Sequence, residues 1–233
     1  MAHDLVLAHS SDLHIGRDGG DRGIGGLRQV LAAAREAGAD VLLLAGDIFD
    51  HNRVPSPVLD AAAAALSGAG CAVVILPGNH DPLRDDAVYH RLALRPGLHV
   101  LGLTDDTAAF PDLQLEVGGQ PHTDYHDMHP LPRPWPRSQR RTVVMAHGHY
   151  VGGPADLHRA WLIHDDDIAA LGADYVALGH WDRRERVGRE GAFAYYSGSP
   201  DLARSINIAR FARNGAGVSV VARSLRDGTE TTL

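Results

Sequence analysis

Five short apolar stretches of the chain end in polar residues that are able to bind metal ions. The stretches cover residues 5–12, 41–47, 72–81, 142–149 and 175–182. The polar residues in and just beyond their ends are Asp12, His14, Asp47, Asp50, Asn79, His80, Asp81, His147, His149, His180 and Asp182. Carboxylate, imidazole and amide groups without a thiolate suit Mn²⁺, Fe or Zn²⁺ in a hydrolytic centre. The residue types therefore predict metal-dependent hydrolysis, if the fold gathers them at one place.

The number of these residues argues for a pair of ions. One Asp after a strand is usually a turn former or a helix cap. Five strand ends with such polar residues in one chain favour a shared metal site over five separate turns or caps. The predicted ligands are Asp12, His14, Asp47, Asn79, His147, His180 and Asp182. Seven ligands exceed the need of one ion, and a carboxylate with two oxygens can be shared between two ions. We predict two divalent ions, with Mn²⁺ preferred and Fe or Zn²⁺ as alternatives.

The elements that must position these residues are strands separated by helices. The apolar stretches predict buried strands, and helices are predicted over 25–38, 56–67 and near 165–171. In the helix over 56–67, Ser56 is the expected N-cap and Pro57 the first helical residue. Alternating strands and helices predict a layered α/β domain, in which ligands bind beyond the carboxyl ends of the strands.

The pattern changes in the last third of the chain. Residues 192–200, 206–212 and 217–225 alternate like strands without a helix between them, which predicts or extends a second, more antiparallel sheet. Residues 120–138 hold five of the 13 prolines, so we expect an irregular loop on the surface.

Length, charge and cysteine content narrow the class of protein. The 233 residues are 44% hydrophobic and 22% charged, which favours a single globular domain over residues 1–233. The lone Cys71 excludes a disulfide framework. The sequence shows neither a signal peptide nor a membrane segment, so we expect a cytoplasmic protein. The net charge of −7 argues against binding nucleic acid through a broadly basic surface.

The order of the motifs resembles a known family. Five short motifs follow one another in an order similar to the signature of calcineurin-like metallophosphoesterases. They are D-x-H at Asp12, G-D-x-x-D at Gly46, G-N-H-D at Gly78, a strand-end His147 and G-H at Gly179. The flanking segments 9–17, 46–57, 174–180 and 195–200 are similar to SbcD-type DNA repair exonucleases. The resemblance implies an α/β fold of four layers, an αββα sandwich of two mixed β-sheets flanked by helices.

The resemblance also implies how the ligands are shared. Asp12, His14 and Asp47 would hold one ion. Asp47, Asn79, His147 and His180 would hold the other, so that Asp47 bridges the pair. The family pattern G-H-x-H has a second histidine where this chain has Asp182. We expect Asp182 to coordinate directly, with an indirect contact through water as the alternative.

A two-ion centre predicts a reaction at phosphorus. Two ions lower the pKa of a bridging water, and the resulting hydroxide attacks the phosphoester. His80 is the predicted general acid or hydrogen-bond donor, and Asp81 is predicted to orient its imidazole. Asp50 is expected to orient the Gly46–Asp47 turn. His149 is placed at the rim of the site, and no catalytic role is expected for His122 in the proline-rich loop.

The substrate is less defined than the chemistry. A phosphodiester of DNA is favoured by the flanking similarity and by arginine clusters over 133–141 and 183–189. A small-molecule, nucleotide-type phosphodiesterase or phosphatase is the alternative, and a non-catalytic binding module is the least favoured hypothesis. Because the chain is shorter than SbcD-type enzymes, we expect neither a capping domain nor a segment that binds an SbcC-type ATPase partner.

Overall fold

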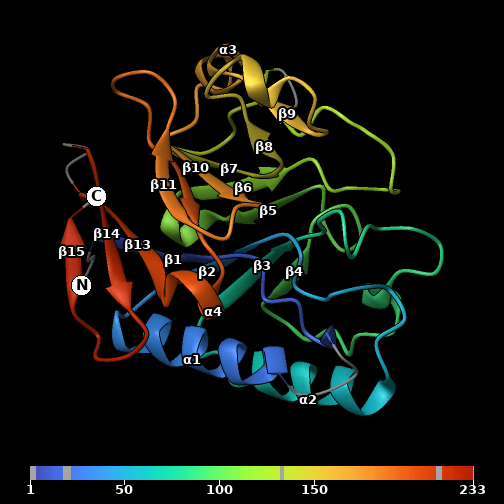
Figure 1. Ribbon diagram of the computed structural model, residues 1–233. Coiled ribbons are helices and arrows are strands. Elements are labelled where there is room, and N and C mark those ends of the chain that lie inside the picture. Colours follow the sequence, from blue (N-terminus) through green and yellow to red (C-terminus); the bar gives the residue numbers. More distant parts are fainter. Residues whose placement is uncertain (1–3, 18–21, 132–133, 214–216, 233) are drawn as a thin grey trace.

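A computed structural model describes residues 4–17, 22–131, 134–213 and 217–232. Two mixed sheets lie face to face, and helices cover the outer face of each (Figure 1). The two long helices lie below the seven-stranded sheet, and a short helix lies beyond the six-stranded sheet. This arrangement confirms the predicted four-layer αββα sandwich.

The seven-stranded sheet carries the N-terminal half of the predicted ligands. Its strands are β1 (Leu5–Ser10), β2 (Val41–Ala45), β3 (Ala72–Leu76), β4 (Leu98–Val100), β13 (Ser205–Phe211), β14 (Val218–Ser224) and β15 (Glu230–Thr232), in the order β15-β14-β13-β1-β2-β3-β4. Strands β1 to β4 are parallel, so their carboxyl ends share one edge. β13, β14 and β15 extend the sheet in antiparallel pairs.

The six-stranded sheet carries the remaining ligands. Its strands are β5 (Thr107–Phe110), β6 (Leu115–Gly119), β7 (Arg141–His147), β10 (Tyr175–Gly179), β11 (Arg184–Val187) and β12 (Ala194–Ser197), in the order β11-β12-β10-β7-β6-β5. The four central strands are parallel, and antiparallel β11 and β5 form the edges.

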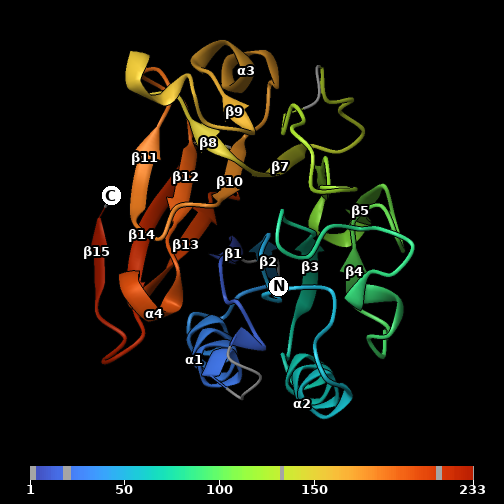
Figure 2. The same ribbon diagram turned by 45° about the vertical axis from the view of Figure 1, so that its right-hand side comes forward.

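The helices form where apolar residues recur at helical spacing. Helix α1 (Arg22–Glu36) buries Ile24, Leu27, Leu31 and Ala34 on one face, which packs on the seven-stranded sheet beside α2 (Ser56–Ser67) (Figure 2). Helix α2 has the predicted range, but its N-cap is Pro55, so Ser56 is the first helical residue and not the predicted cap. The six-stranded sheet is covered by helix α3 (Asp165–Ala170) and by the short strand pair β8 (His149–Tyr150) and β9 (Leu162–Ile163). The short helix α4 (Pro200–Ala203) precedes β13.

Two sequence-based expectations about the chain after residue 119 were wrong in part. The last strands do not form a sheet of their own, because β12 joins β10 in parallel, whereas β13 and β14 pair with the β1 edge. The proline-rich segment is irregular in its described residues, as predicted, but it does not lie wholly on the surface. His122 and Leu131 of this segment are buried.

Apolar side chains fill the space between each pair of layers. One cluster lies between the long helices and the seven-stranded sheet, a second between the two sheets, and a third between the six-stranded sheet and α3. No helix within the described ranges is long and apolar enough to cross a membrane.

A buried histidine between the sheets makes stability depend on pH. The Nδ1 atom of His9 lies 2.9 Å from the hydroxyl of Tyr175, and burial lowers the pKa of His9 to about 3. The unfolded chain binds this proton below about pH 6.5, so folding loses stability as the pH falls from there towards 3. Between pH 7 and pH 5 we expect His9 to cost about 2 kcal/mol of unfolding free energy.

Urea unfolding of the wild type and of His9→Gln at both pH values measures this cost. Glutamine cannot take up the proton, so the variant should lose less stability on acidification than the wild type. Equal losses in the two proteins would show that His9 is not the group responsible.

Candidate metal centre

The predicted ligands gather where the carboxyl ends of both sheets meet. Asp12 and His14 follow β1, Asp47 follows β2, Asn79 follows β3, His147 ends β7, and His180 and Asp182 follow β10. Strand β2 packs against β7 and β10 of the facing sheet. Parallel strands in each sheet and close packing between the sheets therefore bring side chains from five separate segments to one edge.

Asp47 lies at the centre of this edge. Its Oδ2 atom is 3.2 Å from Nε2 of His147 and 3.9 Å from Nε2 of His14. Its Oδ1 atom accepts a hydrogen bond of 2.9 Å from the backbone N–H of His80. Two sets of groups are close enough to hold an ion, namely His14, Asp47 and His80, and Asp12, Asp47 and His147. Asp47 is the one residue that both of these sets contain.

The two imidazoles nearest Asp47 contact other groups through their second ring nitrogens. Nδ1 of His147 donates to the carbonyl oxygen of Ala45 at 2.9 Å, which directs Nε2 towards Asp47. Metal-binding histidines usually engage the second nitrogen in this way, since the hydrogen bond sets both tautomer and orientation. Nδ1 of His14 lies 3.0 Å from Oδ1 of Asp50, a charge contact without hydrogen-bond geometry, and its Nε2 lies 3.9 Å from Asp47.

The backbone at the site adopts conformations that side chains normally avoid. Asp12, His14, Asp47 and His180 all have positive φ, at 54°, 45°, 54° and 101°. Such residues cost free energy and collect at functional sites, where surrounding contacts hold them. Gly46 also has positive φ, at 87°, and a Cβ atom there would overlap the imidazole of His147. The turn after β2 thus requires glycine.

The charges of the site are unbalanced without cations. The pKa of Asp12 is raised to about 7, because burial and the nearby charge of Asp47 outweigh the attraction of His147. Burial also opposes the charge of Asp47, but attraction and hydrogen bonding by His147 outweigh it and lower the pKa of Asp47 below its usual range. The pKa of His147 rises to about 10, because the charge of Asp47 outweighs the burial of the imidazole. A protonated His147 thus supplies the positive charge that the buried carboxylates require, and bound ions would replace that proton.

Of the other three predicted ligands, Asn79 and His180 lie beside His147, whereas Asp182 does not. The Oδ1 atom of Asn79 lies 3.1 Å from Nε2 of His147. The backbone N–H of His180 donates to Oδ2 of Asp12 at 3.1 Å, and burial lowers the pKa of its imidazole to about 3, so that the ring is neutral. Asp182 is exposed and belongs to neither set of converging groups, although it lines the same cavity as Asp12 and His14.

The predicted role of Asp81 was wrong. Nδ1 of His80 donates to the backbone carbonyl of Asp50 at 3.0 Å, so it is Asp50 that orients this imidazole. The buried carboxylate of Asp81 accepts hydrogen bonds from the backbone N–H groups of residues 48, 49 and 78 and from the hydroxyl of Tyr89. These bonds fasten the loop after β2 to the loop after β3 and so set the distance between Asp47 and Asn79.

Two supporting residues were not recognised in their roles. Asp50 contacts His14 and Arg17 rather than the Gly46–Asp47 turn. His122 is buried beside His147, and its Nε2 atom donates to the His147 carbonyl at 2.8 Å. Asp50 carries a signal in the G-D-x-x-D spacing, whereas His122 is placed by an irregular loop that has no comparable pattern.

The arginine clusters form contacts within the protein. Arg137 pairs with Asp174, Arg183 with Glu185 and Arg189 with Asp166, whereas Arg184 donates to Ser205. Arg133 lies outside the described residues. Much of the local positive charge is therefore offset by acidic partners.

The fold and this site together define a class. Two packed mixed sheets with carboxylates and imidazoles at their shared edge are typical of metal-dependent hydrolases. A family model described as calcineurin-like phosphoesterase matches residues 5–183, and the chain belongs to this family.

Similar proteins agree with this assignment. The chain is 26% identical over 255 residues to a protein of Bacillus subtilis (strain 168) that is named as one subunit of the nuclease SbcCD. The match covers 90% of this chain and 65% of that protein. The chain thus spans less than two thirds of that relative.

Solved structures share the fold at low identity. The TT1561 protein of Thermus thermophilus aligns with a TM-score of 0.63 at 12% identity, over 96% of this chain and 100% of that one. The phosphoesterase Yfce of E. coli aligns at 0.51 and 17% identity, over 98% and 97% of the two chains. A 5'-nucleotidase precursor of Thermus thermophilus aligns at 0.54 and 11% identity, over 94% of this chain and 54% of its own.

Proposed function

We propose that this protein hydrolyses phosphodiester bonds at a centre of two divalent ions. The ions would be held by Asp12, His14, Asp47, Asn79, His147, His180 and Asp182. The observation that carries the proposal is the position of Asp47, whose Oδ2 atom lies between the Nε2 atoms of two histidines. When bound, the ions supply an activated water and stabilise negative charge on the phosphoryl oxygens.

The residues of the chain then have separate tasks. Asp50 contacts His14, and the carbonyl of Ala45 orients His147. His80 presents a free Nε2 atom to the site, because its Nδ1 atom is held by the carbonyl of Asp50. In the imidazolium form, which carries a proton on both ring nitrogens, this side chain would be positioned to donate from Nε2 to the leaving oxygen. A cavity of about 360 Å³ borders the site at Asp12 and His14 and is lined further by Arg17 and Asp182, and it is where the phosphoester would enter.

Two candidate classes of substrate are proposed. Similarity to a nuclease subunit supports the first candidate, a DNA exonuclease. We propose Mn²⁺ as the preferred ion because the donors are carboxylate, amide and imidazole groups. The paired arginines and the net charge of −7 favour the second candidate, a phosphodiesterase for small nucleotide-type esters.

A panel of substrates tests the proposal. The purified protein is assayed with Mn²⁺ and with EDTA on methyl p-nitrophenyl phosphate, p-nitrophenyl phosphate, and single- and double-stranded DNA. Metal-dependent cleavage of the diester supports the proposed activity, and DNA cleavage supports the first candidate. Turnover confined to the monoester, or metal binding without turnover of any substrate, would contradict it.

A further inference from the structure

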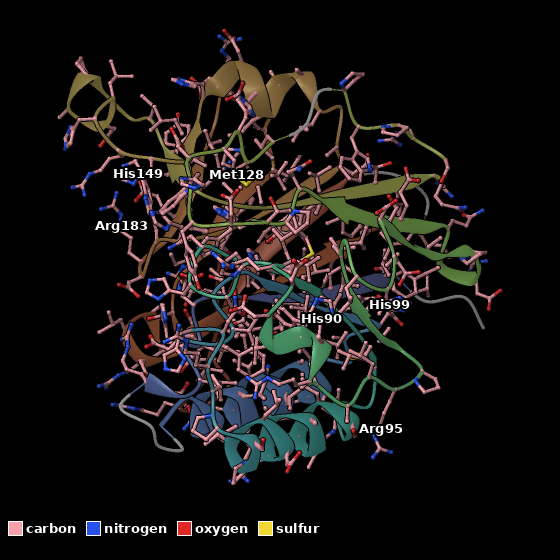
Figure 3. All side chains as sticks on the ribbon, turned by 90° about the vertical axis from the view of Figure 1, so that its right-hand side faces the viewer. His90, Arg95, His99, Met128, His149 and Arg183 are labelled. Atoms are coloured by element: carbon pink, nitrogen blue, oxygen red, sulfur yellow. The ribbon has the colours of Figure 1, made fainter. Side chains whose placement is uncertain are left out.

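A second hollow adjoins the metal centre on the side of β8 and β11. This groove has a volume of about 570 Å³, which lies in the range of small-molecule sites. His180 and Asp182 line both this groove and the region of the proposed ions. Figure 3 shows His149 and Arg183, two further lining residues, at the same edge of the molecule. A substrate with its phosphate at the ions would therefore extend into the groove.

A column of three planar groups forms one wall of the groove. Tyr196 is buried, and its ring stacks on the indole of Trp181 at 4.4 Å between centroids and 14° between planes. The guanidinium of Arg183 lies over the opposite face of that indole, with Cζ 4.2 Å from the ring centroid. The Arg183 side chain is 67% exposed, lines the groove and is paired with Glu185 through Nε.

Hydrogen bonds fix the column and its neighbour His149. The hydroxyl of Tyr196 donates to the carbonyl of Gly148 at 2.7 Å and accepts from the backbone N–H of Tyr150 at 2.9 Å. Nε1 of Trp181 donates to Nδ1 of His149 at 3.1 Å, and Nε2 of His149 lies 3.2 Å from Asp156. Indole N–H can only donate, so His149 carries its proton on Nε2. The wall is thus preorganised before any ligand binds.

The polar groups of the groove are of mixed charge. Arg159 and Arg183 line it together with Asp156, Asp182 and Glu185, and Arg183 is paired with Glu185. A surface of this kind suits a neutral, planar group with both donors and acceptors better than a second run of phosphates. Nucleobases have that chemistry, because they stack on aromatic and guanidinium planes and carry ring N–H or amino donors beside carbonyl or ring-nitrogen acceptors.

We propose that this groove binds the nucleoside of a nucleotide-type phosphodiester, with its base stacked on the column of Tyr196, Trp181 and Arg183. The inference rests on the proposed phosphodiesterase function and assigns the substrate class to the same site. The nucleoside can come from a free nucleotide ester or from the end of a nucleic acid strand.

Two substrates with one leaving group test this assignment. Thymidine 5'-(p-nitrophenyl phosphate) and methyl p-nitrophenyl phosphate differ only in the nucleoside. With Mn²⁺, Trp181→Ala and Arg183→Ala should lower kcat/KM about tenfold more for the thymidine ester than for the methyl ester. Arg189→Ala is the matched control, because Arg189 is also exposed and ion-paired but lies outside the groove. It should not change the ratio between the two substrates.

The outcomes separate this inference from the proposed function. Hydrolysis of both esters with equal losses in the variants would overturn the groove assignment and leave the phosphodiesterase intact. If neither ester is hydrolysed, the phosphodiesterase proposal fails. Calorimetry with thymidine 5'-monophosphate then tests the groove alone, and undiminished affinity in Arg183→Ala would overturn it.

A last arm identifies the source of the nucleoside. The wild-type kcat/KM for the thymidine ester is compared with that for single-stranded oligothymidylate. A higher value for the oligomer supports a strand end as the ligand, and a higher value for the ester supports a free nucleotide.

Discussion

Replacing Asp47 with asparagine is expected to lower kcat/KM for a phosphodiester by at least about 10³-fold, equivalent to about 4 kcal/mol of lost transition-state stabilisation. The variant should also bind fewer than two ions per chain. The amide keeps one oxygen, which can still accept the hydrogen bond from the backbone of His80. It loses the negative charge and the second oxygen, and both are needed if one side chain is to serve two cations. Elemental analysis and steady-state kinetics measure the two effects.

Asp50→Asn is the matched comparison for this variant. It makes the same chemical change three residues further along, at a carboxylate that contacts His14 and Arg17 and is not a predicted ligand. Loss of a group that orients a metal-binding histidine typically costs about 10-fold to 100-fold in affinity or activity, so we expect a smaller defect than for Asp47. Thermal unfolding confirms that both variants are folded. Two bound ions and a wild-type rate in Asp47→Asn would contradict the bridging role.

Those two aspartates also show what the sequence can and cannot specify. Both follow β2 in one short motif, and the motif identifies them as polar residues at a strand end. Which of them points to the centre depends on backbone conformation and on contacts from other segments. Asp47 has positive φ and receives His147 from the facing sheet. Asp50 meets His14, which follows another strand.

The fold was predictable where patterns are local. The buried strands β1, β2, β3, β7 and β10 and the helix α2 follow from apolar runs and from proline and serine at a helix start. The strands that pair with β12 and β13 could not be predicted, because alternating side chains identify a strand but do not determine which strand lies next to it in the sheet. β12 lies parallel to β10, whereas β13 crosses to the other sheet beside β1. Such pairings depend on contacts between distant segments.

The roles of supporting residues were the hardest to predict. Asp81 follows His80 directly, yet its side chain turns into the protein and binds backbone N–H groups of two loops. Adjacent residues often face opposite ways in a turn, so neighbourhood in sequence does not imply contact. His122 shows the converse, since a residue of an irregular loop becomes buried behind His147.

Replacing His80 with alanine is expected to lower kcat for phosphodiesters with poor leaving groups by about 10²-fold to 10³-fold. The imidazole ring lies 4.7 Å from the His14 ring between centroids, and its side chain is 43% exposed at the mouth of the site. The bond from Nδ1 to the Asp50 carbonyl leaves Nε2 free to meet a leaving oxygen. A general acid matters most where that oxygen is a poor leaving group, so esters of p-nitrophenol should be affected less than dinucleotides.

The dependence on the leaving group separates this role from a structural one. His80→Gln keeps a hydrogen-bond donor but cannot transfer a proton, so it should recover part of the rate if donation alone is needed. The backbone N–H of residue 80 still bonds to Asp47 in both variants. Because the imidazole also belongs to one of the two sets of converging groups, bound metal is measured in both variants, and a wild-type content is expected if His80 acts on the leaving group rather than as a ligand. Equal losses on p-nitrophenyl esters and dinucleotides, or a parallel loss of bound metal, would show that His80 supports the Asp47 loop instead of acting on the leaving group.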